Sequence, residues 1–371
     1  MIRSLVLSNF KCYESQEFSF KPLTVISGLN STGKSTLVQA LLLLRQSNRE
    51  GILSDGRGLS LNGELVELGT GADVFFESAG GDRAGISVVT DESSMRMDLD
   101  YDLRSRSLRL HSCITDGDFW KHTLFGDAFQ YLRAERLGPR SSGVMSEFGV
   151  RERRQLGANG QFTAHFLSEY RAEEMGHHDL DLGTATARSL LAHVEAWLAE
   201  ISPGVRLNFD VMDRVDLVRM TVSYATAQAV PSEEYRPTNV GFGISYALPI
   251  VVALLSTAQG GLVILENPEA HVHPRGQTRL GEMIARAAAS GIQVIVETHS
   301  DHLLNGVRLA VAEKKISSTD VQLLYNRWTL GSNSPSVREI HVKPDGRLSE
   351  WPDGFFDEFE RSLDALIQHQ D

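Results

Sequence analysis

The chain has 371 residues, of which 42% are hydrophobic and 23% charged, so it is long enough and apolar enough to build a sizeable core. Its net charge of −12 excludes a surface broadly dedicated to nucleic acid, which would need a basic footprint, but leaves a local basic groove open. The sequence indicates neither a signal peptide nor a membrane span, and its two cysteines fit a reducing compartment, so we expect a cytoplasmic protein without a membrane partner.

The N-terminal third is expected to contain strands and one long helix. Short apolar runs predict strands at about residues 5–7 and 23–26, and a glycine-rich turn follows the second. Apolar side chains then recur at helical spacing from Leu37 to Leu44, which predicts a helix. From 60 to 116 polar and apolar residues alternate, so this span is expected to form an antiparallel β subdomain.

The remaining patterns complete an α/β protein that we expect to form one domain over 1–371. Residues 155–236 are expected to form a helical and hairpin insert. From 237 to 310, helices alternate with short apolar strands of the kind found in a parallel sheet buried on both faces. Strands and a helix are expected in 311–371.

A phosphate-binding loop is the clearest motif. The stretch Gly28-Leu-Asn-Ser-Thr-Gly-Lys-Ser-Thr36 matches G-x-x-x-x-G-K-[ST] between a predicted strand and a predicted helix. Its glycines let backbone N–H groups turn toward phosphate oxygens, and the helix dipole adds positive potential. Lys34 is expected to reach the β- and γ-phosphates of ATP, and Ser35 to ligate Mg²⁺. The predicted nucleotide-binding residues are Gly28, Asn30, Ser31, Thr32, Gly33, Lys34, Ser35 and Thr36.

Two later strands end in residues suited to phosphate chemistry. The run Leu262-Val-Ile-Leu is followed by Glu266, which we predict to be a second Mg²⁺ ligand beside Ser35. The run Gln293-Val-Ile-Val-Glu-Thr precedes His299, whose imidazole could donate a hydrogen bond to a γ-phosphate or to the attacking water.

Together these motifs resemble the ABC-type ATPases of the RecF, SMC and OLD group. The resemblance rests on Leu7-Ser-Asn-Phe-Lys11, the phosphate loop, Glu266-Asn-Pro-Glu-Ala-His-Val-His-Pro274, Thr298-His-Ser300 and Trp351-Pro-Asp-Gly-Phe-Phe-Asp357. The last of these is similar to OLD-like ATPases, including subunits of bacterial anti-phage systems. The resemblance implies an α/β ABC-type ATPase head with a mixed sheet around the phosphate-loop helix, an antiparallel β subdomain and a helical insert.

The resemblance also implies an ATP site shared between two subunits. In the family, a signature loop of one subunit closes over the γ-phosphate held by the other, so a head-to-tail homodimer is expected. The matching position in this chain is Val240–Ser245, in which Gly241, Gly243 and Ser245 would contact phosphate. This segment departs from the family's usual Ser-Gly-Gly-Gln.

The usual catalytic acid of the family is replaced. Where the family reads Asp-Glu-Pro, this chain reads Glu266-Asn267-Pro268. Asparagine cannot accept a proton as a general base. We therefore expect slow ATP hydrolysis, with Glu266 or Glu269 taking over part of the catalytic role.

An arginine-rich region permits two interpretations. It contains arginines 133, 136, 140, 151, 153 and 154. The residues are either a solvated face with salt bridges or a lid or groove that contacts nucleotide or nucleic-acid phosphates. Within the region, Glu135 lies in a stretch that resembles the family loop beside the γ-phosphate.

Several functions remain for such a head. The segment after His299 is too short for the Toprim nuclease domain of OLD proteins, so any nuclease-type effector, for example in anti-phage defence, is expected to be a separate polypeptide. Long coiled-coil arms of the SMC type are excluded by the lack of heptads. A compact RecF-like DNA-repair ATPase stays open as the alternative.

Overall fold

The computed structural model describes residues 1–225, 232–329, 331–352, 354–356, 361–363 and 366–367. The chain forms two compact units. The phosphate-loop unit comprises Ile2–Phe119, Glu297–Asp301 and Val321–Asp371. The acidic-motif unit comprises Trp120–Val296 and His302–Asp320, together with Met1. This division into two units does not test the domain boundaries inferred from the sequence, which remain predictions.

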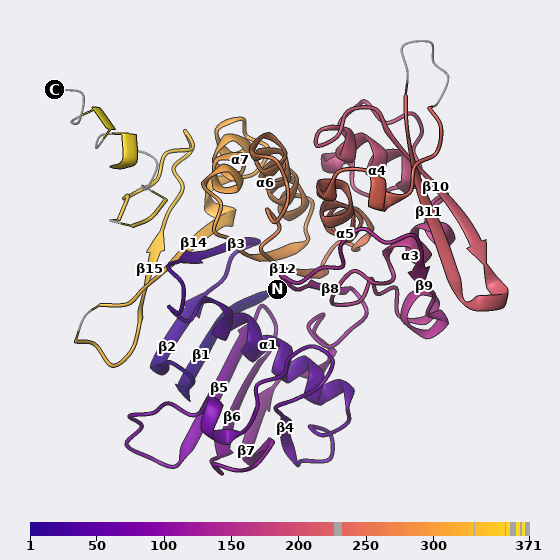
Figure 1. Ribbon diagram of the computed structural model, residues 1–371. Helices are drawn as coiled ribbons and strands as arrows, with labels where there is room; N and C mark the ends of the chain where they lie inside the picture. The colour runs from indigo at the N-terminus through magenta and orange to yellow at the C-terminus, as the bar shows by residue number, and fades with distance from the viewer. Residues whose placement is uncertain (226–231, 330, 353, 357–360, 364–365, 368–371) are drawn as a thin grey trace. The chain divides into compact units, whose positions relative to one another are not determined.

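An antiparallel sheet forms much of the phosphate-loop unit (Figure 1). Its order is β2 (Tyr13–Ser19), β1 (Ile2–Phe10), β5 (Arg83–Thr90), β6 (Ser94–Asp100), β7 (Ser107–Asp116) and β4 (Gly58–Ser60). The alternation predicted for 60–116 is visible in β6, where Met95, Met97 and Leu99 are buried while Arg96 is exposed. The N-terminal hairpin β1–β2 joins the same sheet because β1 pairs with β5. The β sheet therefore begins at the start of the chain.

The strand that leads into the phosphate loop belongs to a mixed sheet. In the same unit β3 (Leu23–Gly28) pairs in parallel with β14 (Val321–Arg327), which pairs antiparallel with β15 (Ser336–Ile340). Helix α1 (Lys34–Arg49) follows the loop and contacts β3 and β4, and the short α2 (Gly71–Val74) lies further along the chain. The predicted helical run is confirmed, since every residue from Leu37 to Leu44 except Gln39 is fully buried. The predicted C-terminal helix falls partly outside the described residues.

The acidic-motif unit combines helices with parallel strands. Its main elements are β8 (Phe129–Leu132), η2 (Glu147–Glu152), α3 (Thr163–Tyr170), η3 (His178–Leu180), α4 (Leu190–Ala199), α5 (Phe242–Ser256), β12 (Leu262–Glu266), α6 (Pro274–Ala289), β13 (Gln293–Glu297), α7 (Asp301–Ala312) and η6 (Ser318–Asp320). Strand β12 pairs in parallel with β8. As expected for a parallel sheet covered on both faces, Leu262–Leu265 and Val294–Val296 are fully buried.

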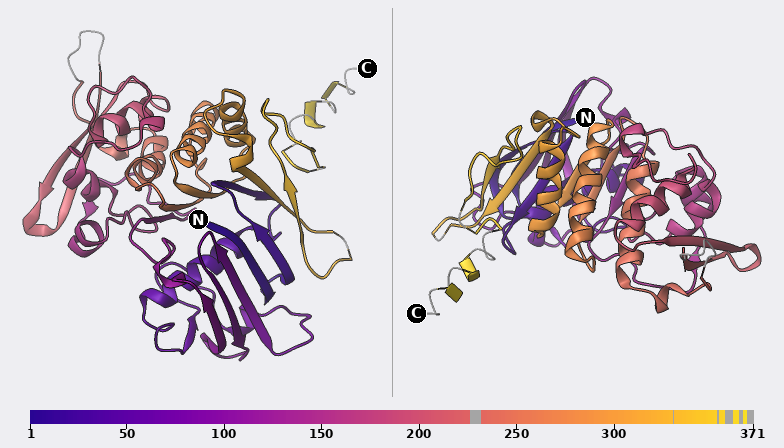
Figure 2. Two further views of the ribbon diagram at one scale, coloured as in Figure 1. Left: turned by 180° about the vertical axis from the view of Figure 1, so that it is seen from behind. Right: turned by 90° about the horizontal axis from the view of Figure 1, so that it is seen from above.

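The predicted hairpin extends from this unit as an arm (Figure 2). Strands β10 (Val205–Met212) and β11 (Leu217–Tyr224) pair antiparallel, and the short β9 (Gly143–Val144) joins β11. The turn between β10 and β11 is η4 (Asp213–Val215), with Asp216 in the left-handed region at φ +52°. The base of the hairpin packs against α3 and α4. The helix η5 (Pro237–Asn239) then leads to α5.

Candidate nucleotide site

The phosphate loop turns sharply between β3 and α1. Gly28 has φ +146°, Ser31 +62° and Gly33 +83°. A Cβ at Gly28 would lie 2.3 Å from the backbone oxygen of Asn326, and one at Gly33 would lie 2.5 Å from Sγ of Cys12. Only glycine fits these two positions, so the backbone can follow the tight path that a phosphate cradle needs.

The other loop residues divide into an exposed crest and a buried floor. Asn30 and Ser31 are exposed at the crest, where their backbone is open to a ligand, whereas Thr32 and Thr36 are buried. The hydroxyl of Thr32 donates to the backbone oxygen of Leu29 at 2.8 Å. Thr32 therefore braces the loop from within.

Lys34 is buried and folded back onto its own loop. Its ammonium group donates to the backbone oxygens of Gly28 at 3.0 Å and Leu29 at 2.6 Å. Burial lowers the pKa of Lys34, while the negative charge of Glu297 opposes this shift. A nucleotide phosphate would offer the ammonium a charged partner in place of two neutral carbonyls.

Ser35, the predicted Mg²⁺ ligand, contacts an acid that lies outside the predicted site residues. Its hydroxyl donates to Oε1 of Glu297 at 3.0 Å. Glu297 ends β13, and the next residue, Thr298, donates its backbone N–H to the oxygen of Ile26 in β3 at 3.0 Å. His299 follows at the end of the strand and is exposed. Glu297 ends an apolar strand as Glu266 does, and that shared pattern is the signal for it in the sequence.

A pocket of about 1300 Å³ opens beside the phosphate loop within the same unit. Residues of the loop and the start of α1 line one part, and Lys11 and Gln39 lie nearby, with the Lys11 ammonium donating to Gln39 Oε1 at 2.7 Å. Aromatic side chains line another part: Phe75 and Tyr101 stack at a centroid distance of 3.8 Å. The pocket is large enough for a nucleotide and combines cationic with aromatic groups.

In the acidic-motif unit, both carboxylate oxygens of Glu266 are engaged. The hydroxyl of Tyr131 donates to Oε1 at 3.1 Å, and the backbone N–H of Ala134 donates to Oε2 at 3.2 Å. Burial raises the pKa of Glu266 despite these hydrogen bonds. The contacts come from the end of β8 and the loop after it, the stretch that contains Glu135, which is itself exposed.

Arg136 holds the turn that follows Glu266. It is 4% exposed, and its guanidinium donates to the backbone oxygens of Glu266 at 2.7 Å and Asn267 at 2.6 Å. Burial lowers the pKa of Arg136 to about 10, and the charge of Glu269 opposes the shift, so Glu269 acts on this guanidinium. Asn267 has φ +45°. One buried arginine thus stabilises, through two backbone carbonyls, the turn that follows β12.

The predicted signature segment forms the N-terminus of a helix. Gly241 caps α5, is exposed and has open space around an added Cβ, and Gly243 lies in the first turn. Ser245 is 9% exposed, and its hydroxyl is buried without a hydrogen-bond partner among the described residues. The start of this turn is therefore exposed at Gly241, whereas the Ser245 hydroxyl is buried.

The structure divides the arginine-rich region. Arg136 is buried under the Glu266 turn, so it is unavailable to nucleic acid. Arg151 pairs with Glu169 at 2.9 Å and Arg154 with Glu173 at 2.7 Å. The salt-bridge interpretation therefore holds for these two, while Arg140 is exposed and Arg133 and Arg153 are half-buried.

The residues around the phosphate loop fit Mg²⁺ bound with a nucleotide. Oxygen ligands are those that this hard cation prefers; Ser35 supplies a hydroxyl oxygen, and the carboxylate of Glu297 places a negative charge beside it. Within the described ranges, no group of three His, Cys, Asp or Glu could hold a metal alone. That suits a cation that usually keeps water and phosphate oxygens as most of its ligands.

Two family models match the chain. A family model described as "AAA domain, putative AbiEii toxin, Type IV TA system" matches residues 23–305, and "Protein of unknown function (DUF3696)" matches 316–366. No curated protein matches the chain. In the part of the chain that the structure describes, no helix is long and apolar enough to cross a membrane.

Two solved structures share the fold. An SMC head bound to the C-terminal winged-helix domain of ScpA is 14% identical with a TM-score of 0.50, and the match covers 92% of this chain and 98% of that one. An SMC head with an extended coiled coil, bound to the C-terminal domain of ScpA derived from Pyrococcus furiosus, is 13% identical with a TM-score of 0.50. That match covers 100% of this chain and 99% of the other. The chain therefore has the fold of an SMC head, as the resemblance predicted.

Proposed function

The chain belongs to the AAA family whose model it matches over residues 23–305, and from this premise we propose that it is a slow ATPase that works as an ATP-dependent switch. The observation that carries the proposal is the phosphate loop, with Lys34 buried at its base and Ser35 bonded to a carboxylate. ATP and Mg²⁺ would occupy this loop. Two copies would join head to tail, with the N-terminus of α5 from one copy reaching the γ-phosphate on the other.

Slow turnover follows from the acidic motif. Asn267 stands where the family has its general base, and an amide cannot take a proton from water. Both oxygens of Glu266 are hydrogen-bonded, and the negative charge of Glu269 helps to keep the pKa of the buried Arg136 from falling further. We therefore propose that Glu266 and Glu269 supply a weak substitute, with His299 at the γ-phosphate, and that the ATP-bound dimer is long-lived.

A separate effector protein would recognise the ATP-bound state of this switch. The family description names a putative toxin of a toxin–antitoxin system, and both solved SMC heads are bound to a separate protein. These facts support a separate effector over direct action on DNA, and we propose that the effector is nuclease-type and acts in anti-phage defence. The net charge of −12 and the ion pairs of Arg151 and Arg154 point the same way.

The test is the size of the protein in solution together with its turnover. We expect the wild type to become a dimer with ATP and Mg²⁺, and Lys34→Ala to stay monomeric because it lacks the phosphate-binding ammonium. Turnover should lie below about 1 per second, the lower end for active enzymes. A wild type that stays monomeric with every nucleotide would contradict the shared site. Fast hydrolysis that survives both Glu266→Gln and Glu269→Gln would contradict the weak catalytic acid.

A further inference from the structure

Strand β13 delivers a buried carboxylate to the phosphate loop. Glu297 is 5% exposed, and its Oε1 accepts the hydroxyl hydrogen of Ser35 at 3.0 Å. The adjacent backbone is held in the same unit, because the N–H of Thr298 donates to the oxygen of Ile26 in β3 at 3.0 Å. The contact thus joins two rigid elements, the end of a buried strand and the first turn of α1.

The direction of this hydrogen bond matters for a cation. A serine hydroxyl binds Mg²⁺ through an oxygen lone pair, so its hydrogen must point away from the metal toward another acceptor. Glu297 is that acceptor, and its negative charge makes the serine oxygen a better donor to the cation. Groups that orient a metal ligand in this way commonly change metal affinity by about 10- to 100-fold when they are removed.

We propose that Glu297 is a positioning residue that orients Ser35 toward the Mg²⁺ of bound ATP. This role rests on the proposed function, since it requires that the chain bind ATP with a divalent cation.

The experiment compares nucleotide affinity with and without metal in the full chain. The affinity of a fluorescent, non-hydrolysable ATP analogue is measured in EDTA and in Mn²⁺, and the ratio of the two dissociation constants reports the coupling between metal and nucleotide. The variants are Glu297→Gln, Glu297→Asp, Ser35→Ala and the double variant Ser35→Ala/Glu297→Gln. Glu195→Gln is the control, because Glu195 is also a buried acid, 7% exposed, and bonds the backbone N–H of Leu207 in the other unit.

We expect Glu297→Gln to reduce the coupling at least about tenfold while affinity in EDTA stays within about twofold of the wild type. Glu297→Asp keeps the charge and should recover part of the coupling. If Glu297 acts through Ser35, the double variant should be no weaker than Ser35→Ala. Glu195→Gln should match the wild type.

The outcomes separate this role from the proposed function. A wild type that shows coupling, beside a Glu297→Gln variant with the same coupling, would overturn the role of Glu297 and leave the switch intact. Equal losses in EDTA and in Mn²⁺ would make Glu297 a structural anchor of the loop and would also overturn the role. A wild type that binds no analogue under either condition would overturn both.

Discussion

Arg136 shows how one side chain can shape an acidic motif from outside it. Its two terminal nitrogens reach the carbonyls of Glu266 and Asn267, and one of them also donates to the oxygen of Arg133 at 3.1 Å. These carbonyls belong to a turn with Asn267 in the left-handed region, where a non-glycine residue costs about 1–2 kcal/mol. The planar guanidinium fork offsets that cost with several charge-assisted hydrogen bonds.

We expect Arg136→Lys to destabilise the protein by about 2 kcal/mol, because a lysine ammonium lacks the fork and leaves buried carbonyls without donors. Turnover should fall about tenfold as the Glu266 turn loosens. Denaturant unfolding and steady-state hydrolysis measure the two effects. Arg140→Lys is the control, since Arg140 is exposed on the same stretch and should change neither. Equal effects of the two substitutions would contradict this role.

The phosphate-loop residues can be predicted because their pattern is local, whereas the roles of Arg136 and Glu297 cannot. In the sequence Arg136 is one member of a basic region, and only the fold shows that it is buried under the Glu266 turn. The motif at the end of β13 points to His299, although Glu297 is the residue that contacts the loop. Its contact with Ser35 joins positions 262 residues apart, which no spacing rule connects.

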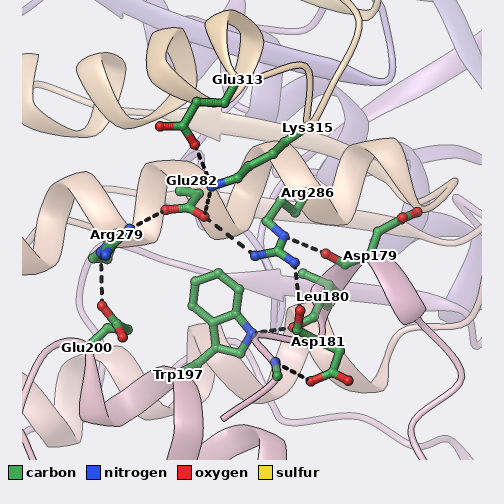
Figure 3. Close-up of polar contacts among 11 residues, drawn as sticks. Asp179, Leu180, Asp181, Trp197, Glu200, Arg279, Glu282, Arg286, Glu313 and Lys315 are labelled. Carbon is green, nitrogen blue, oxygen red and sulfur yellow. Dashed lines mark hydrogen bonds and ion pairs between the residues drawn. The ribbon is translucent and has the colours of Figure 1, made fainter.

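At the scale of elements, helix α6 is anchored through one buried acid (Figure 3). Glu282 accepts hydrogen bonds from Lys315 at 2.6 Å and Arg279 at 2.7 Å, and Arg286 lies at 3.5 Å. Arg286 also donates to the backbone oxygen of Asp181 at 2.8 Å, just after η3. The cluster therefore ties α6 to the segment before α4 and to the chain after α7.

The pH dependence of stability should report this cluster. Burial alone would raise the pKa of Glu282, but the hydrogen bonds from Lys315 and Arg279 hold the pKa below its ordinary value of 4.5. The ionised form is thus favoured by folding, so its contribution is present above about pH 4.5 and is lost as the pH falls through the lower folded-state pKa. We expect Glu282→Gln to lower the free energy of unfolding by about 2 kcal/mol at pH 7.

Denaturant unfolding at pH 7 and at about pH 3 measures this difference. The difference in the free energy of unfolding between the wild type and Glu282→Gln should be smaller at the lower pH. Glu313→Gln is the matched control, because Glu313 pairs with the same Lys315 but its side chain is 55% exposed. The Glu313→Gln substitution should lower the free energy of unfolding by less than about 1 kcal/mol. If Glu282→Gln lowered the free energy of unfolding equally at both pH values, the ion pairs of Glu282 would not account for its contribution to stability.

Helices and strands with a clear hydrophobic pattern can be predicted from the sequence more easily than the strands that pair with them. The short apolar runs that form β3, β12 and β13 and the buried helix α1 are all visible in the sequence. The pairing of β1 with β5 is not, because Leu7 and Ile86 lie opposite each other only after a long excursion of the chain. Alternation shows which face of a strand is buried, but not which strand lies beside it.

At the scale of the whole molecule, the proposed shared site would make ATP hydrolysis depend on two chains. In a symmetric head-to-tail dimer, each phosphate loop would be completed by the α5 N-terminus of the other copy. Gly241 is a suitable position at which to disrupt phosphate binding by the α5 N-terminus. An added Cβ there would have open space around it, so the fold should survive. Gly241→Glu would place a negative charge where a phosphate is expected, and Lys34→Ala would break the other half of the site.

Mixing these two variants tests the shared site directly. Each variant alone should hydrolyse almost no ATP, because both of its composite sites carry a defect. A mixed dimer contains one site with an intact Lys34 loop facing an intact Gly241 end. Because pairing is expected to need ATP in a complete site, dimers should form chiefly between the two variants. Each mixed dimer has one complete site of two, so at equal amounts activity should recover to at most about half of the wild type. Single-turnover hydrolysis measures it, and a mixture no more active than its components would show that each chain completes its own site.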